Sequence, residues 1–209
     1  MTYDRITRLL HLCIAVGITG QQFNSLVMVY PKPGRAGDAF YALHEMGGQV
    51  LLGLLLLHWI WSLARQRELP FVLLFPWFSP ERYGAILADA QRYLNHARVF
   101  RLPDTTQQAM PLASAIQGLG LLTATLLGIS GVVMDLGMEK NGAMIGWVRD
   151  IKEIHEVLGS LMWLYLVVHA TMGMLHQWSG HGSMRAMIRV WEKNPSPDLV
   201  ISHLHDQQP

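Results

Sequence analysis

The stretch HEMGGQVLLGLLLLHWIWSLA, residues 44–64, decides the fold. Glu45 is its only formally charged residue, and leucine fills most of its centre. A helix needs about 20 predominantly apolar residues to cross the hydrocarbon core of a bilayer. The stretch therefore predicts a transmembrane helix.

Three further stretches meet the same requirement, and they are residues 9–29, 111–134 and 154–177. The first of them is the weakest, because Gln21, Gln22 and Asn24 interrupt it. The sequence thus predicts an all-α fold, an integral membrane four-helix bundle formed as a single domain by residues 1–194. Residues 195–209 are expected to be a polar tail.

The composition excludes several other classes of protein. Residues of the AVILMFWYC set make up 51% of the 209 residues and charged residues only 15%, whereas soluble domains carry about 25% charged residues. The apolar content excludes a disordered chain, and a net charge of +1 gives no general attraction to nucleic acid. A single cysteine excludes a disulfide framework, a cysteine-built iron–sulfur cluster and covalent c-type haem.

Lysine and arginine are unevenly distributed between the two sides of the predicted membrane domain. Eleven of the 16 lie in the N-terminal segment, the 65–110 connection and the C-terminal tail. The other five are Lys32, Arg35, Lys140, Arg149 and Lys152. Cytoplasmic segments carry the excess of positive charge, so both termini are predicted to be cytoplasmic.

The cytoplasmic connection 65–110 contains two interfacial signals. Residues 71–80 are rich in proline and aromatic residues, with Trp77 and Phe78 as predicted anchors. Residues 81–94 predict an interfacial helix, for which a plain solvated helix is the alternative. Its apolar side would carry Ile86, Leu87, Ala90 and Leu94, and its water-facing side Arg82, Asp89 and Arg92.

Small residues recur at four-residue spacing in the stretch 111–134, at Gly120, Ala124 and Gly128. Such stripes let helix backbones approach closely in lipid. This helix has no histidine, so its predicted role is packing.

Five of the ten histidines lie in or at the edge of the predicted spans, and they are His11, His44, His58, His155 and His169. Ligand-capable side chains inside a membrane are functional candidates by default. His44 and His58 are 14 residues apart, as are His155 and His169. Fourteen residues come within about 40° of four full helical turns, so each pair shares a helix face at two depths about 21 Å apart.

This arrangement permits two metal sites stacked across the bilayer. A haem iron takes two axial ligands on opposite faces of the porphyrin, and facing helices of a bundle can supply them. A flat macrocycle also needs small residues beside it, and one turn after four of the histidines stand Ala15, Gly48, Gly159 and Gly173. Ser62 follows His58 in the same way, so this pattern does not exclude His58. We therefore predict two b haems.

Three other interpretations remain. A lone membrane histidine is often an interhelical hydrogen-bonding group. A zinc or copper site would gather its ligands at one depth, and a proton-coupled transporter would place Asp or Glu near the membrane centre. A haem-free membrane transporter and a structural membrane anchor are thus the alternative functions, and both predict a colourless protein.

Several stretches resemble the bacterial cytochrome b561 family and the related b-type cytochrome subunits of membrane-bound hydrogenases. They are RITRLLH at 5–11, LHEMGG at 43–48, KEIHEVLG at 152–159, VHA at 168–170 and GSMRAM at 182–187. The resemblance covers roughly residues 1–190. It implies four helices, two b haems and a location in the bacterial inner membrane.

The resemblance places the axial ligands on His11, His44, His155 and His169. The direction of each span supports pairing His44 with His155 at the periplasmic haem and His11 with His169 at the cytoplasmic haem. His58 departs from the family, in which an arginine usually stands at this position. His58 is therefore an alternative ligand to His11, a propionate partner or part of a quinone site. His176, two turns beyond His169, is expected to be a polar group at the interface.

The function implied by the resemblance is electron transfer across the membrane. The donor would be a periplasmic redox enzyme subunit or a small reductant such as superoxide, and the acceptor the quinone pool, as ubiquinone or menaquinone. With both axial positions filled, the iron has no open site, so no catalytic residue is assigned. Whether the chain is an oxidoreductase itself or the cytochrome b subunit of one stays open. The expected partners are membrane lipid, quinone, a redox enzyme subunit or a second copy in a homodimer, and no nucleic acid.

Overall fold

The computed structural model describes residues 4–65, 76–97 and 111–178. In these ranges the regular elements are helices, as the sequence predicts, with one isolated β-bridge between Lys32 and Arg35. The elements are α1 (Arg5–Ser25), α2 (Ala39–Ala64), the short 3₁₀ helix η1 (Pro76–Phe78), α4 (Pro80–Ala97), α5 (Pro111–Gly137) and α6 (Trp147–Trp178). The predicted polar tail lies outside the described residues.

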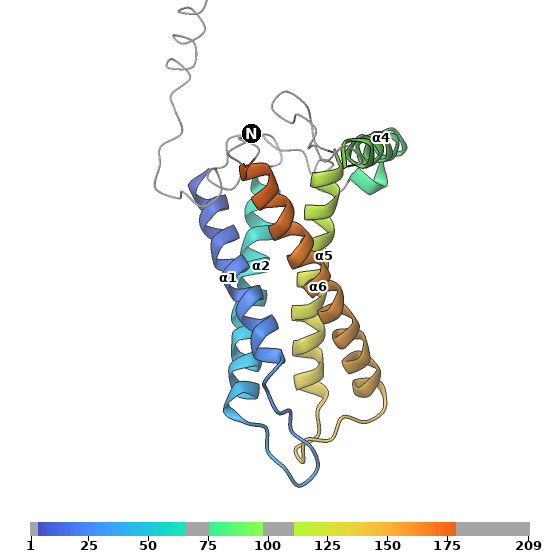
Figure 1. Cartoon of the computed structure of the whole chain (residues 1–209). Coiled ribbons are helices and arrows are strands. Elements are labelled where there is room, and N and C mark those ends of the chain that lie inside the picture. Colours follow the sequence, from blue (N-terminus) through green and yellow to red (C-terminus); the bar gives the residue numbers. More distant parts are fainter. Residues whose placement is uncertain (1–3, 66–75, 98–110, 179–209) are drawn as a thin grey trace, which may run out of the picture.

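The four long helices α1, α2, α5 and α6 lie side by side (Figure 1). α1 packs on α2, α2 on α5 and α5 on α6, and α1 also contacts α6. The connections 26–38 and 138–146 join these helices at one end of the bundle, which we call the loop end. The start of α1 and all of α4 lie at the opposite end, which we call the N end.

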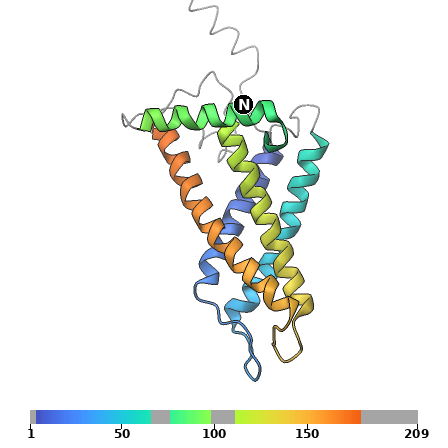
Figure 2. The same ribbon diagram turned by 90° about the vertical axis from the view of Figure 1, so that its right-hand side faces the viewer.

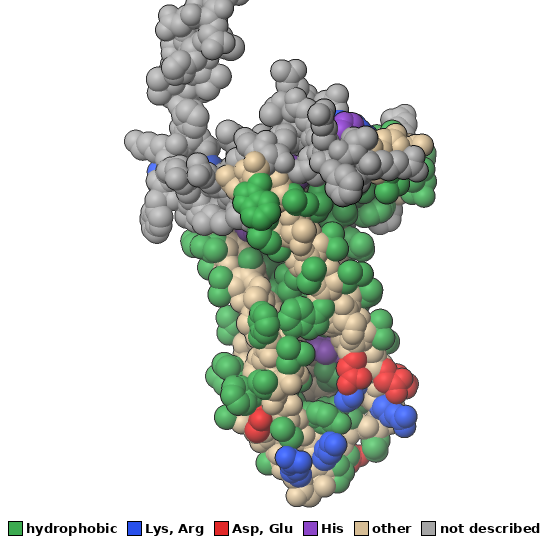
Figure 3. All heavy atoms as spheres, viewed as in Figure 1, with side chains coloured by type: hydrophobic (Ala, Val, Ile, Leu, Met, Phe, Trp, Pro, Cys, Tyr) green, Lys and Arg blue, Asp and Glu red, His purple; other side chains and the backbone are tan. Residues whose placement is uncertain are grey.

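Three of these helices, α2, α5 and α6, are long and apolar enough to cross a membrane. α1 is the helix that the sequence marks as the weakest candidate, and its crossing stays a prediction. Large apolar side chains cover the flank of the bundle seen in Figure 3, whereas charged side chains gather at the loop end. This outward-facing apolar surface is what contact with lipid requires.

Helix α1 lies four residues nearer the N-terminus than the predicted span 9–29, and α2 and α6 begin five and seven residues before their predicted spans. α2 begins at Ala39 rather than at residue 44, because the Asp38 carboxylate accepts a hydrogen bond from the Tyr41 amide (2.8 Å) and caps the helix there. α6 begins at Trp147 rather than at residue 154. Its first two turns carry the charged residues Arg149, Asp150, Lys152 and Glu153. These residues are helical although they do not belong to the apolar stretch.

The small residues of α5 pack as predicted. Ala124 is buried in a cluster with Leu55 of α2 and Met162 of α6. Gly120 faces Tyr165 of α6, and a Cβ at Gly120 would overlap the tyrosine ring. Gly128 faces Leu52 of α2. Because glycine has no side chain, Gly120 and Gly128 let α6 and α2 approach α5 closely.

Helix α4 confirms the predicted helix but not the predicted role of Asp89. The helix runs across the N end of the bundle (Figure 2). Ile86 is buried as expected, and Leu87 and Leu94 stay exposed on an apolar side. Asp89 was predicted to face water, but it is buried. Its carboxylate is satisfied there, since it accepts hydrogen bonds from the Leu112 amide (3.2 Å) and from Arg92 (2.7 Å). Asp89 therefore caps α5 and fastens α4 to it.

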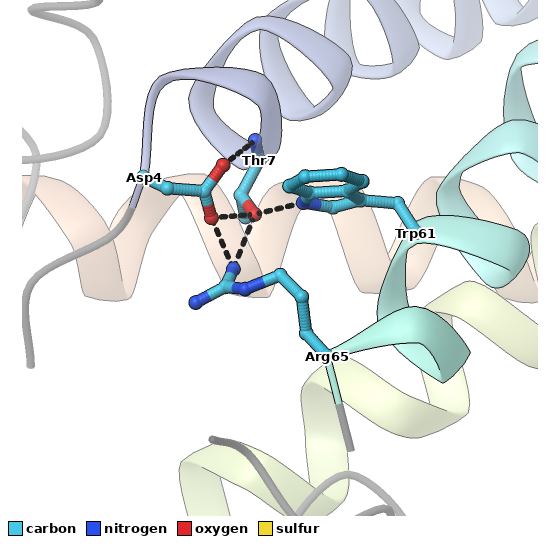
Figure 4. Close-up of polar contacts among 4 residues, drawn as sticks. All are labelled: Asp4, Thr7, Trp61 and Arg65. Carbon is cyan, nitrogen blue, oxygen red and sulfur yellow. Dashed lines mark hydrogen bonds and ion pairs between the residues drawn. The ribbon is translucent and has the colours of Figure 1, made fainter. Parts of the chain in front are cut away.

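A second polar contact closes the N end between α1 and α2 (Figure 4). Asp4 accepts a hydrogen bond from the Thr7 amide (2.9 Å) and pairs with Arg65. The Thr7 hydroxyl accepts further bonds from Trp61 (3.2 Å) and Arg65 (2.9 Å). Burial raises the pKa of the Asp4 carboxyl, but the hydrogen bonds from Thr7 and the charge of Arg65 outweigh it, so the pKa lies below its ordinary value.

Candidate haem-binding sites

Two histidines face each other near the loop end of the bundle. His44 comes from the second turn of α2 and His155 from the third turn of α6. Their ring centres are 6.3 Å apart and the ring planes are nearly perpendicular, at 81°. We call His44 and His155 the loop-end pair.

Two further histidines face each other near the N end. His11 of α1 and His169 of α6 have ring centres 6.4 Å apart, with 50° between the planes. We call them the N-end pair. Because His155 and His169 are 14 residues apart on α6, the two pairs lie about 21 Å apart along the helix.

The spacing of both pairs fits one iron between two imidazoles. A metal–imidazole bond is about 2 Å long and the ring centre lies about 1 Å behind its nitrogen, so two axial rings have centres about 6 Å apart. Rotation about the bond axis allows any angle between the ring planes. Each pair could therefore supply the two protein nitrogens that a b-type haem iron requires.

The residues predicted to border the macrocycles leave space at the loop-end pair. A Cβ placed on Gly48 or Gly159 would meet nothing within 4 Å. Ala15 and Gly173 lie one turn from His11 and His169, and both are half-buried. The open surroundings of the two glycines are consistent with a flat group passing between α2 and α6.

Polar side chains contact the rings of the loop-end pair. The Ser130 hydroxyl of α5 lies 2.8 Å from Nδ1 of His155. One end of the Gln21 amide of α1 lies 2.7 Å from Nδ1 of His44. A hydrogen bond fixes ring orientation, and one accepted from Nδ1–H leaves Nε2 as the metal-binding atom. The contact at His44 is instead donated by the Gln21 amide nitrogen, because the amide oxygen accepts from the Gly48 amide. Four helices thus contribute to this site.

The N-end pair has a different environment. Tyr165, one turn before His169 on α6, stacks on its ring with centres 5.2 Å apart and 17° between the planes. The tyrosine oxygen lies 3.5 Å from Nδ1 of His169, at the limit of a hydrogen bond. Stacking, rather than a short hydrogen bond, positions this ring.

His58 lies near His11 but does not replace it in the pair. It is half-buried on α2 and close enough to His11 for the two imidazoles to interact electrostatically. Its Nδ1 is buried and forms no hydrogen bond within the described residues. An orphaned polar atom at this depth indicates a missing partner. The ring that stands opposite His169 is His11.

His176 is in contact with α4, as expected of a polar group at the end of the bundle. Its Nε2 lies 3.3 Å from the Tyr93 hydroxyl, and the two rings meet edge to face. The contact joins the last turns of α6 to α4, away from the two histidine pairs.

Sequence reasoning did not identify Gln21, Gln22 or Ser130 as site residues. Gln22 is buried and donates a hydrogen bond to the Gly159 carbonyl of α6 (2.9 Å). Asn24 donates to the Phe40 carbonyl of α2 (2.8 Å). The only signal in the sequence was polarity inside apolar stretches, which makes the first span the weakest candidate. In the structure, Gln21, Gln22 and Asn24 join α1 to its neighbours.

Comparison with known proteins agrees with this arrangement. The model of the family described as prokaryotic cytochrome b561 matches residues 2–189. Neither a curated protein nor a solved structure matches the chain. Proteins of this family are membrane electron-transfer cytochromes with b-type haem. The facing histidines of this chain and its helices that are long and apolar enough to cross a membrane agree with the match, which covers nearly the whole sequence. The chain therefore belongs to the prokaryotic cytochrome b561 family.

Proposed function

We propose that this protein carries electrons across the bacterial inner membrane between a periplasmic donor and the quinone pool, using two b haems. One haem would be held by His44 and His155 and the other by His11 and His169. The observation that carries the proposal is the pair of facing histidine sets, each with ring centres 6.3–6.4 Å apart. Haem supplies a one-electron iron couple, and filled axial positions keep it an electron carrier.

The proposal includes four membrane crossings with both termini in the cytoplasm. Polar residues make the sequence of α1 the least apolar of the four spans, but their contacts support a membrane crossing. Gln22 and Asn24 are hydrogen-bonded to neighbouring helices rather than turned toward lipid. The N end would then be cytoplasmic and the loop end periplasmic. α4 would lie at the cytoplasmic interface with Leu87 and Leu94 toward the acyl chains.

Quinone would react beside the N-end pair. Quinone reduction couples electrons to protons, and an imidazole with a near-neutral pKa is suited to exchange them. His58 offers a buried Nδ1 that has no hydrogen-bond partner among the described residues. Ser62, one turn further along α2, offers a hydroxyl on the same side. The alternative roles of His58 are an axial ligand and a propionate partner.

The electron donor would dock at the loop end. Lys32 and Lys152 both lie over the Tyr30 ring, at 4.8 and 5.3 Å from its centre, and so bring together positive charge from the 26–38 connection and the start of α6. Arg35, Lys140 and Arg149 belong to the same end. Such a surface would steer an anionic donor or an acidic subunit, with a rate that falls with ionic strength.

A visible spectrum and a haem assay test the proposal. Purified protein should show a reduced-minus-oxidised b-type spectrum and approach two haems per chain. A ratio near one would overturn the two-haem model, and a colourless protein would favour a transporter or a structural anchor. Reduced protein should then be oxidised by added ubiquinone or menaquinone analogues, and failure with both would remove quinone from the proposal.

A further inference from the structure

Ser130 is the polar side chain of α5 that reaches the loop-end pair. It is 8% exposed, and its hydroxyl oxygen lies 2.8 Å from Nδ1 of His155. The next residue, Gly131, also lies against this ring, since a Cβ there would be 3.5 Å from Cε1. α5 therefore forms the wall behind His155, on the side of the ring that carries Nδ1.

The direction of the hydrogen bond follows from where the serine proton goes. A hydroxyl has one proton to donate, and Ser130 donates it to the Leu127 carbonyl (3.1 Å). The oxygen is then an acceptor toward the imidazole, so Nδ1 of His155 must carry the hydrogen. This contact selects the tautomer whose Nε2 lone pair is free for a metal.

We infer that Ser130 is a positioning residue that holds His155 in its metal-binding tautomer and lowers the reduction potential of the loop-end haem relative to the N-end haem. The inference rests on the proposed two-haem function. A hydrogen bond accepted from Nδ1–H makes an imidazole ligand more basic, and a more basic ligand favours Fe(III) over Fe(II).

Within the described residues, the other three histidines lack this device. The Gln21 amide turns its nitrogen toward the His44 carbonyl and Nδ1, because its oxygen accepts a hydrogen bond from the Gly48 amide, so it donates to Nδ1 rather than accepting from it. Tyr165 is 3.5 Å from His169. The asymmetry between the haems would therefore arise mainly from one serine on the helix that provides no ligand.

Three variants of the full-length protein test the inference. Ser130→Ala removes the acceptor, Ser130→Thr keeps a hydroxyl, and Ser160→Ala removes an exposed hydroxyl of α6 that bonds only to the Glu156 carbonyl among the described residues. Each is compared with the wild type by haem-to-protein ratio, electron paramagnetic resonance of the ferric haems and potentiometric titration. The component that disappears in His155→Ala identifies the loop-end haem.

In Ser130→Ala we expect the potential of the loop-end haem to rise and its resonance to shift, with the N-end haem unchanged. A tenfold loss of the preference for Fe(III) corresponds to a rise of about 59 mV for one electron. Loss of the loop-end haem alone, restored in Ser130→Thr, would also support the inference. An unshifted Ser130→Ala, or an equal shift in Ser160→Ala, would overturn it. A wild type without two haems would instead contradict the proposed function.

Discussion

The loop-end and N-end pairs have the same ligands and nearly the same ring separation, yet their surroundings differ. At the loop end, Ser130 and Gln21 lie within 2.8 Å of the two Nδ1 atoms. At the N end, the corresponding polar contact is 3.5 Å long, and a third imidazole, His58, stands near His11. The ring spacing would define where each proposed haem iron binds, whereas the neighbouring side chains would decide what each iron does.

The two ends therefore suit different functions, electron transfer alone at the loop end and electron transfer coupled to proton movement at the N end. Short hydrogen bonds keep a ligand in one orientation, which suits a haem that only passes electrons. A stacked tyrosine and a histidine with an orphaned nitrogen suit the end where protons must also move. The following four experiments test this comparison.

The largest expected effect is the loss of one haem in His155→Ala. Its iron would lose one of two ligands, so the haem-to-protein ratio should fall from about two to about one while the N-end spectrum stays. His176→Ala is the matched control on the same helix, since His176 contacts Tyr93 instead, and it should keep both haems. Loss of a haem from His176→Ala would mean that the N-end ligand on α6 has been misassigned.

The next effect concerns His58→Leu, which distinguishes the roles of the third imidazole. If His58 exchanges protons with quinone, haem content and spectra stay the same and quinone turnover falls, by about 100-fold or more for loss of a general acid–base group. Stopped-flow oxidation by a quinone analogue measures this. Disappearance of the N-end haem would instead make His58 the ligand in place of His11.

A smaller and more local effect is expected for Gly120→Ala. The new Cβ would displace Tyr165, which stacks on His169, at a cost of about 1–3 kcal/mol for overpacking. The N-end haem should be released at a lower temperature, with the loop-end haem unaffected. Gly53→Ala on α2, where a Cβ meets nothing within 4 Å, is the control. Equal loss from both haems would show that the two ends are not independent.

The smallest effect compares the capping aspartates of the two ends. Asp4→Ala should lower stability by about 1 kcal/mol, as a lost helix cap does, and Asp4→Asn by less, because asparagine still caps. The pKa of Asp4 lies below its ordinary value of 3.8, so its charge stabilises the fold above that pH. The advantage of wild type over Asp4→Asn should vanish as pH falls through the lowered pKa.

Asp38→Asn is the loop-end control for this experiment. Asp38 accepts hydrogen bonds from the Tyr41 and Val29 amides rather than from an arginine. The effect of Asp4→Asn, in which Arg65 loses the negative charge of Asp4, should therefore shrink in high salt, whereas that of Asp38→Asn should not. Thermal melts in two salt concentrations measure the difference, and identical salt responses would exclude a role for the Arg65 pair.

The sequence predicted the helices because apolar runs of about 20 residues reveal a span. A spacing of 14 placed His44 with His58 and His155 with His169 on shared helix faces. The set His11, His44, His155 and His169 came from the resemblance to the family, and its pairing from the direction of each span. The sequence did not predict Ser130 at His155 or Asp89 at the start of α5, because these contacts depend on which helix lies beside which. Short polar residues carry no periodic signal, and their partners are 25 and 23 residues away along the chain.

The polar residues of α1 have a consequence for how the protein is made. Gln21 and Asn24 find their partners on α2, the next helix to leave the ribosome, but Gln22 bonds to the Gly159 carbonyl, 137 residues later. In a bilayer without water, each unsatisfied amide costs free energy. α1 therefore reaches its full stability only after α6 has been inserted. Chains that stop before α6 would retain a first helix that is poorly anchored, a ready signal for membrane quality control to remove them.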